Sequence, residues 1–160
     1  MSDEFVVVSA KEEDWEPAME LAWRTFQKFE APVYSEEGTN HFLDFISDEK
    51  LFKMFLAGEY PLYVARCGDK IVGMVSLRSK NHVSLLFVDE KYHRKGIGRA
   101  LLSFAQKKLL EQGLVVLTVN ASPYGVPFYK RVGFMETDKE QFTDGIIYYP
   151  MTCLVRIESN

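Results

Sequence analysis

Residues 93–99 combine basic side chains with two closely spaced glycines, between an apolar segment that predicts a strand and an amphipathic segment that predicts a helix. Glycine lets the backbone approach a ligand closely, and the first N–H groups of a helix have no partners within that helix. These N–H groups carry partial positive charge, and Arg94, Lys95 and Arg99 add full charges. The pattern therefore predicts a loop that holds the phosphate groups of a cofactor.

Two common phosphate-binding motifs do not fit this loop. No Gly-Lys-Ser/Thr follows, as a P-loop requires, and Leu101 stands where a dinucleotide fingerprint needs its third glycine. The six residues from His93 to Gly98 read His-Arg-Lys-Gly-Ile-Gly, and they resemble the acyl-CoA loop of the GCN5-related N-acetyltransferases (the GNAT family), Gln/Arg-x-x-Gly-x-Gly/Ala. Histidine replaces the usual first residue, and its ring can also donate a hydrogen bond. The resemblance implies acetyl-CoA as acyl donor, bound by His93, Arg94, Lys95, Gly96, Ile97, Gly98 and Arg99.

A second stretch, residues 120–134, strengthens the resemblance. It ends in Phe-Tyr-x-x-x-Gly-Phe, similar to the second cofactor motif of the family, in which Asn-x-x-Ala-x-x-x-Tyr-x-x-x-Gly-Phe is common. Between Asn120 and Tyr129 the gap is two residues longer here, and Pro127 replaces a small residue. The resemblance implies that Asn120 and Phe128 contact the cofactor and that Tyr129 protonates or hydrogen-bonds the departing sulfur. A phenol suits this role because its ordinary pKa near ~10 keeps it protonated at neutral pH.

The implied reaction is the attack of a primary amine on a thioester, which requires loss of an amine proton and a donor for the tetrahedral oxyanion. In the family, the fourth strand supplies a backbone N–H beside the thioester, and its neighbouring backbone pairs with pantetheine. By the resemblance, the residues of that stretch are Leu86, Phe87 and Val88.

Several groups are candidates for the base. Some family members place a glutamate at the start of the fourth strand, where this chain has His82, whose ordinary pKa of about 6.5 suits proton transfer near neutrality. Glu36 and Glu37, at the start of a predicted helix, are rivals, and water is a further alternative. Tyr34 and Tyr124 are candidate acceptor-pocket residues, as is Trp23, whose helical neighbours favour a place in the core.

The order of predicted elements is that of an α/β domain spanning residues 1–160. Apolar patterns and turn residues predict strands at 4–10, 62–67, 70–78, 82–88, 114–119, 134–142 and 146–155, and helices at 15–29, 35–46, 51–56, 97–113 and 122–132. The strands at 82–88 and 114–119 are expected to be buried on both faces. The GNAT resemblance implies a mixed, mostly antiparallel sheet with helices on both faces, whose fourth and fifth strands splay apart to form the cofactor cleft.

The composition of the chain limits the kinds of partner that it is expected to bind. The chain has 160 residues, 47% of them hydrophobic, and a net charge of −4 that argues against a nucleic-acid partner. Residues 1–60 hold 14 acidic against 5 basic residues, which suits either a cationic acceptor or an ordinary solvated surface. No apolar run predicts a membrane span, and the two cysteines predict thiols in a reducing cytoplasm rather than a disulfide or a metal site.

The sequence leaves two functions open. One is N-acetyl transfer from acetyl-CoA to a small-molecule amine or a peptide, without a metal. The other is a catalytically silent domain that binds acyl-CoA as a sensor or interaction module. The resemblance also makes a homodimer an expectation.

Overall fold

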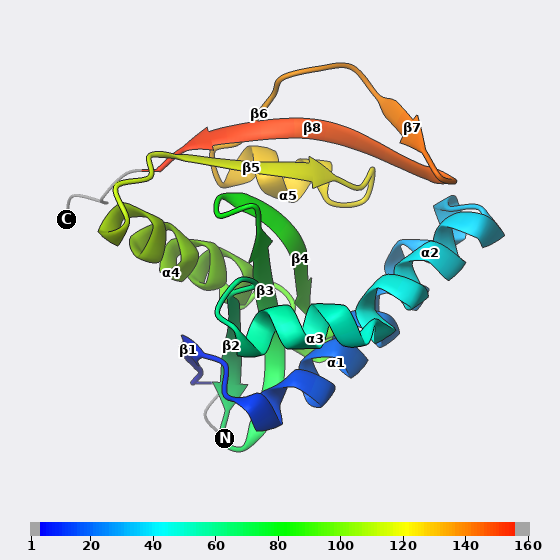
Figure 1. Ribbon diagram of the computed structural model, residues 1–160. Coiled ribbons are helices and arrows are strands. Elements are labelled where there is room, and N and C mark those ends of the chain that lie inside the picture. Colours follow the sequence, from blue (N-terminus) through cyan, green and yellow to red (C-terminus); the bar gives the residue numbers. More distant parts are fainter. Residues whose placement is uncertain (1–3, 156–160) are drawn as a thin grey trace.

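The computed structural model describes residues 4–155, which form one sheet with helices packed on both faces (Figure 1). The strands are β1 (Val6–Ser9), β2 (Leu62–Cys67), β3 (Lys70–Arg78), β4 (His82–Val88), β5 (Val116–Ala121), β6 (Met135–Glu136), β7 (Gln141–Thr143) and β8 (Ile146–Leu154). The α-helices are α1 (Trp15–Phe29), α2 (Glu36–Ser47), α3 (Glu49–Leu56), α4 (Ile97–Glu111) and α5 (Val126–Arg131). Short 3-10 turns are η1 (Glu12–Asp14), η2 (Ala31–Val33) and η3 (Glu90–Tyr92).

The sheet has the order β1-β2-β3-β4-β5-β8-β6, and β7 also pairs with β8. Neighbouring strands are antiparallel except β4 and β5, which are parallel and pair only at His82–Thr118 and Val83–Val119. Beyond Val83 the two strands separate, so the rest of β4 keeps a partner only in β3. This arrangement confirms the predicted mixed sheet and the predicted splay.

Two apolar cores hold the layers together. One core lies between the sheet and helices α4 and α5, and it contains Ile97, Leu101 and Tyr129. The other lies between the sheet and helices α1 to α3, and it contains Trp15 and Phe26. Helices therefore cover both faces, as predicted. No helix within residues 4–155 has the length and apolar composition to cross a membrane.

Helix α5 is shorter than predicted. The sequence places a helix start at Ser122, but the Ser122 hydroxyl accepts the N–H of Gly125 at 3.0 Å and closes a turn instead. The helix begins at Val126, with Pro127 in the first turn, where a missing N–H costs no hydrogen bond. The prediction was wrong because a Ser-Pro pair is typical of a helix start, whereas here it belongs to the turn that precedes the helix.

The strand predictions need three corrections. β5 runs from Val116 to Ala121, two residues later than predicted, because its register is set by pairing with β8. The predicted strand at 134–142 is divided into β6 and β7, separated by the polar residues 137–140. β4 and β5 each alternate between buried and partly exposed residues rather than being buried on both faces, because the splay leaves one side of each strand facing an opening.

Candidate active site

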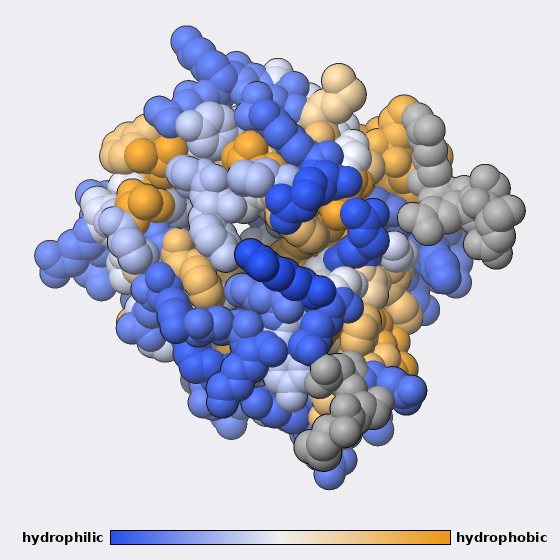
Figure 2. Space-filling model, turned by 180° about the vertical axis from the view of Figure 1, so that it is seen from behind, coloured by the Kyte–Doolittle hydropathy of each residue, from blue (hydrophilic) through white to orange (hydrophobic). Residues whose placement is uncertain are grey.

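A cleft of about 1020 Å³ lies where β4 and β5 separate. Its walls come from β4, from residues 92–99, from the end of β5 with the turn and helix that follow, and from the ends of α1 and α2. The face seen from behind is largely hydrophilic and is hollowed near its middle (Figure 2). Of the predicted cofactor-binding residues, the structure brings to the cleft Leu86, Phe87, Val88, His93, Arg94, Gly96, Ile97, Gly98, Arg99, Asn120 and Phe128.

The backbone of β4 alternates between its neighbour β3 and the cleft. The Asp89 N–H donates to the carbonyl of Val72 on the β3 side at 2.8 Å. Because antiparallel pairing uses every second residue, Phe87 also points its N–H at β3, whereas Leu86 and Val88 point theirs toward the opening. The His93 ring binds the carbonyl of Val88 through Nε2 at 2.8 Å, which ties the glycine loop to the end of β4.

The loop between β4 and α4 has two residues in the left-handed region, Arg94 at φ 65° and Gly96 at φ 80°. Such turns make successive N–H groups converge, and they lead here directly into the first turn of α4. A Cβ atom at Gly98 would lie 3.0 Å from Cζ of Phe128, so glycine allows this turn to pack on α5. The exposed residues Arg94 and Arg99 also line this part of the cleft.

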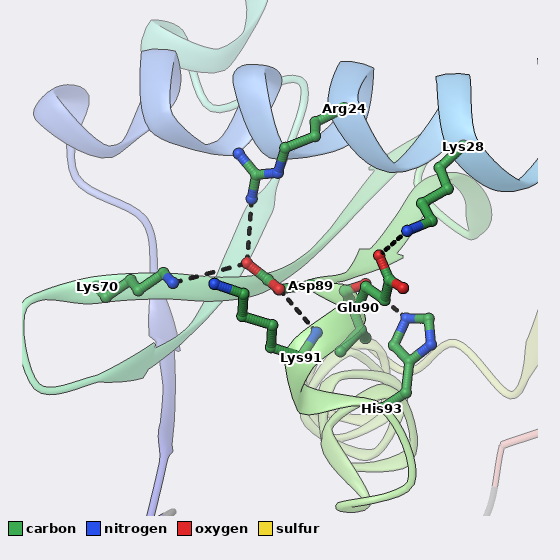
Figure 3. A network of polar contacts seen from close by, with 8 residues as sticks. Arg24, Lys28, Lys70, Asp89, Glu90, Lys91 and His93 are labelled. Carbon is green, nitrogen blue, oxygen red and sulfur yellow. Dashed lines mark hydrogen bonds and ion pairs between the residues drawn. The ribbon is translucent and has the colours of Figure 1, made fainter.

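A network of ion pairs holds the start of this loop against α1 and β3 (Figure 3). Asp89 is buried, and its carboxylate accepts the N–H of Lys91 at 2.9 Å and pairs with Arg24 at 3.1 Å and Lys70 at 3.8 Å. One turn further along α1, Lys28 pairs with Glu90 at 2.5 Å. Helix α1 thus positions the glycine loop, a link that the sequence motifs do not reveal.

Tyr129 lies buried on α5 and lines the cleft. Burial raises the pKa of its hydroxyl above the ordinary value of 10.0, and the charge of Glu30 raises it further. The phenol therefore stays protonated at neutral pH, as the sequence-based argument for a hydrogen-bond donor requires.

Glu30 is a cleft residue that the sequence analysis missed. It caps the C-terminal end of α1, is partly buried, and faces the Ser122 hydroxyl. Burial raises its pKa from 4.5 to about 7, and the hydrogen bond from Ser122 offsets part of that rise. No local pattern could have singled it out, because its environment comes from segments about ninety residues away in the chain.

His82 is the predicted catalytic residue that the structure does not bring to the cleft. It lies where β4 and β5 are still paired, and its Nδ1 is 2.7 Å from Oγ1 of Thr118. Burial, and secondarily the charge of Arg78, lower its pKa from 6.5 to about 4, which makes its ring a weak base. Lys95, Trp23, Glu36 and Glu37 also lie outside the lining, whereas Tyr34 and Tyr124 belong to it.

Helix α2 and the β7–β8 turn meet at the far end of the cleft, opposite the glycine loop. The Ser35 hydroxyl donates to the carbonyl of Gly145 at 3.2 Å and also accepts the N–H of Gly38 at 3.0 Å. Beside this contact, ligating atoms of the exposed residues Glu37, His41 and Asp144 lie within 4.8 Å of one another. This contact joins two segments that are far apart in the sequence across one end of the cleft.

Comparison with known proteins agrees with this geometry. The acetyltransferase (GNAT) domain profile matches residues 30–155. The chain belongs to the GNAT acetyltransferase family. It is 33% identical over 119 residues to the peptidyl-lysine N-acetyltransferase YjaB of Salmonella typhimurium. The matched stretch covers 70% of this chain and 79% of YjaB. It is 38% identical over 94 residues to the N-acetyltransferase YafP of Escherichia coli. This matched stretch covers 59% of this chain and only 57% of YafP.

Solved GNAT structures share the fold. A GCN5-related N-acetyltransferase from Rhodopseudomonas palustris has a TM-score of 0.81 at 22% identity, covering 96% of this chain and 98% of that one. The PaiA N-acetyltransferase of Thermoplasma acidophilum, solved with coenzyme A, has a TM-score of 0.74 at 23% identity. The match covers 94% of this chain and 99% of PaiA. These similarities confirm the predicted fold, and the domain profile confirms the predicted family.

Proposed function

We propose that this GNAT-family chain transfers the acetyl group of acetyl-CoA to a primary amine. The observation that carries the proposal is the opening between β4 and β5, which turns backbone groups of β4 toward a cleft that ends at the glycine loop. The coenzyme A bound to PaiA and the N-acetyltransferase names of YjaB and YafP support the same donor and reaction.

The glycine loop and the first turn of α4 supply the donors for the pyrophosphate of coenzyme A. Their N–H groups have no helical partners and carry the positive end of the α4 dipole. Arg94 and Arg99 add charge at the exposed rim. The pantetheine arm then runs along β4, where Leu86 and Val88 offer backbone groups, with Asn120 on the opposite side of the cleft.

The thioester lies, in this proposal, between β4 and α5. As the amine nitrogen bonds to the thioester carbon, the carbonyl oxygen becomes an oxyanion, which the N–H of Leu86 stabilises. The carbon–sulfur bond then breaks, and the Tyr129 hydroxyl donates to the departing sulfur. Since burial and, secondarily, the charge of Glu30 raise the pKa of Tyr129, its hydroxyl stays protonated and is able to donate to the thiolate.

For the acceptor, the similarity to peptidyl-lysine acetyltransferases favours a lysine side chain, and small-molecule amines are the other candidates. The test pairs calorimetric titration of acetyl-CoA with thiol release across alkylamines, polyamines, amino acids and lysine-containing peptides. Turnover on one class would establish the activity and the acceptor. Binding without turnover on any amine would favour the silent acyl-CoA-binding module.

The variant Gly98→Glu tests the placement of the cofactor. It puts a carboxylate beside the pyrophosphate and a Cβ atom 3.0 Å from Phe128, so we expect the Kd for acetyl-CoA to rise at least ~100-fold. Gln112→Glu, which adds the same charge at the other end of α4, is the matched control and should bind as the wild type does. Near-normal binding by Gly98→Glu would refute the proposed placement.

A further inference from the structure

The side of the cleft formed by α1 and α2 has an aromatic wall. It presents the partly buried or exposed rings of Phe29, Tyr34, Phe42 and Phe45, with Phe26 buried against Phe42. Phe26 and Phe42 stack with centroids 3.9 Å apart, and Phe29 packs between His93 at 5.3 Å and Tyr124 at 5.2 Å. An acceptor that reaches the thioester from this side passes over an apolar surface.

One carboxylate interrupts that surface. Among the described residues that line the cleft, the acidic ones are Glu30 and Asp144. Asp144 is exposed at the far rim, beside Glu37 and His41, whereas Glu30 is partly buried on the segment that follows Phe29. Of these two, only Glu30 therefore combines partial burial with a position in the aromatic wall, directly after Phe29.

Glu30 interacts both with the acceptor wall and with Tyr129, the proposed donor to the leaving group. Its charge acts on the hydroxyls of both Tyr34, in the acceptor wall, and Tyr129, on α5. Ser122, in the turn after β5, faces the carboxylate. Lys28, paired with Glu90, lies on the same helix. Phe29, which precedes Glu30, contacts two further titratable residues, His93, held by the Val88 carbonyl, and Tyr124.

We propose that Glu30 accepts the proton of the acceptor amine, at the inner end of an aromatic pocket that takes an uncharged carbon arm. The inference rests on the proposed N-acetyl transfer. As the carbon–nitrogen bond forms, one proton passes from nitrogen to the Glu30 carboxylate; the carbon–sulfur bond breaks, and sulfur receives a proton by way of Tyr129. Solvent then takes the proton from Glu30 and restores that of Tyr129, so the products are an amide and coenzyme A thiol.

The substrate class follows from the pocket. An arm with one terminal amine, such as a lysine side chain or an alkylamine, places carbon against the rings and nitrogen at Glu30. A second ammonium held among the rings would lose hydration, and cation–π contact would offset only part of that cost. Hexylamine should therefore exceed 1,6-diaminohexane in kcat/KM by at least ~10-fold, from desolvation of about 1.4 kcal/mol or more.

The decisive variant is Glu30→Gln, with Glu20→Gln on the exposed side of α1 as matched control. With hexylamine and acetyl-CoA as probes, Glu30→Gln should lower kcat at pH 7.5 by ~100-fold or more and leave the Kd for acetyl-CoA unchanged. The wild-type kcat should fall as the pH drops through about 7, where Glu30 becomes protonated, and the variant should lose this limb. Ser122→Ala should move the limb to higher pH, because it removes the hydrogen bond that favours the charged carboxylate.

The outcomes separate the two proposals. If the wild type acetylates hexylamine and Glu30→Gln keeps both kcat and the pH limb, Glu30 is not the proton acceptor and the transfer reaction still stands. If only the KM for the amine rises, Glu30 binds the acceptor without taking its proton, which also overturns the inference. If the wild type consumes no acetyl-CoA with any amine, both proposals fall.

Discussion

Asp89 connects the start of the glycine loop to α1 and β3, and its replacement should lower the stability of the protein by a predictable amount. Its carboxylate accepts the Lys91 N–H and pairs with Arg24 and Lys70, whose side chains are 55% and 52% exposed. Because both cations can return to water, each pair contributes only about 0.2 to 1 kcal/mol to stability. Loss of the capping hydrogen bond adds about 0.5 to 2 kcal/mol. Asp89→Ala should therefore lower the free energy of unfolding by about 1 to 4 kcal/mol.

Asp89→Asn separates the two contributions. It keeps an oxygen for the Lys91 N–H and removes the charge, so it should lose only about 0.4 to 2 kcal/mol. Urea unfolding at low salt and at 1 M NaCl measures this loss. High salt should shrink the difference between wild type and Asp89→Asn, because a Debye length of about 3 Å screens the ion pairs. The difference between Asp89→Asn and Asp89→Ala should persist.

The functional consequence is tested with the same proteins. Asp89→Ala releases the start of the glycine loop, so the Kd for acetyl-CoA should rise more than in Asp89→Asn. Asp48→Ala removes a similar cap at the start of α3, where the side chain accepts the Lys50 N–H at 2.8 Å. This control should lose stability without losing acetyl-CoA affinity. Equal stability of the Asn and Ala variants at both salt concentrations would refute the assignment of a capping role.

Three further predictions follow from single residues. Tyr129→Phe should leave the Kd for acetyl-CoA unchanged and lower kcat by ~100-fold or more. Tyr149→Phe, whose hydroxyl binds Glu140 at the surface, should leave kcat unchanged. Equal rates for wild type and Tyr129→Phe in stopped-flow thiol release would remove Tyr129 from the mechanism. Gly145→Ala adds a Cβ against Ser35 at a residue with φ 78°, which disturbs the contact between α2 and the β7–β8 turn. Steady-state kinetics should show a higher KM for the amine and an unchanged KM for acetyl-CoA. If neither KM changes, this contact does not contribute to acceptor binding. The pKa of His82 is about 4 in the folded protein and 6.5 in the unfolded chain, so the unfolded state binds more protons between these values and stability rises with pH there. His82→Gln should therefore make Tm less dependent on pH between pH 4 and 6.5. An unchanged slope of Tm against pH would contradict the lowered pKa.

The sequence predicted the parts of the cofactor site that depend on local backbone chemistry. The glycines at 96 and 98, the basic residues beside them and the strand before them are contiguous, so their spacing alone indicates a loop that opens a helix. The positions of β2, β3, β4 and α4 were predicted for the same reason, because each is bounded by its own turn or glycine signal. The choice of Tyr129 came from a second contiguous motif and remains a prediction about its role.

The rest was decided by pairing between distant segments. Whether His82 faces the cleft depends on where β4 and β5 part, and that point is set by sheet register rather than by residue spacing. Glu30 sits at a helix end that gives no local signal, and its raised pKa comes from burial, which only the packed chain supplies. The local motifs of this chain determined the glycine loop and the helix that follows it, whereas the tertiary structure decided which acid and which aromatic rings line the cleft, since these come from elements that meet only after folding.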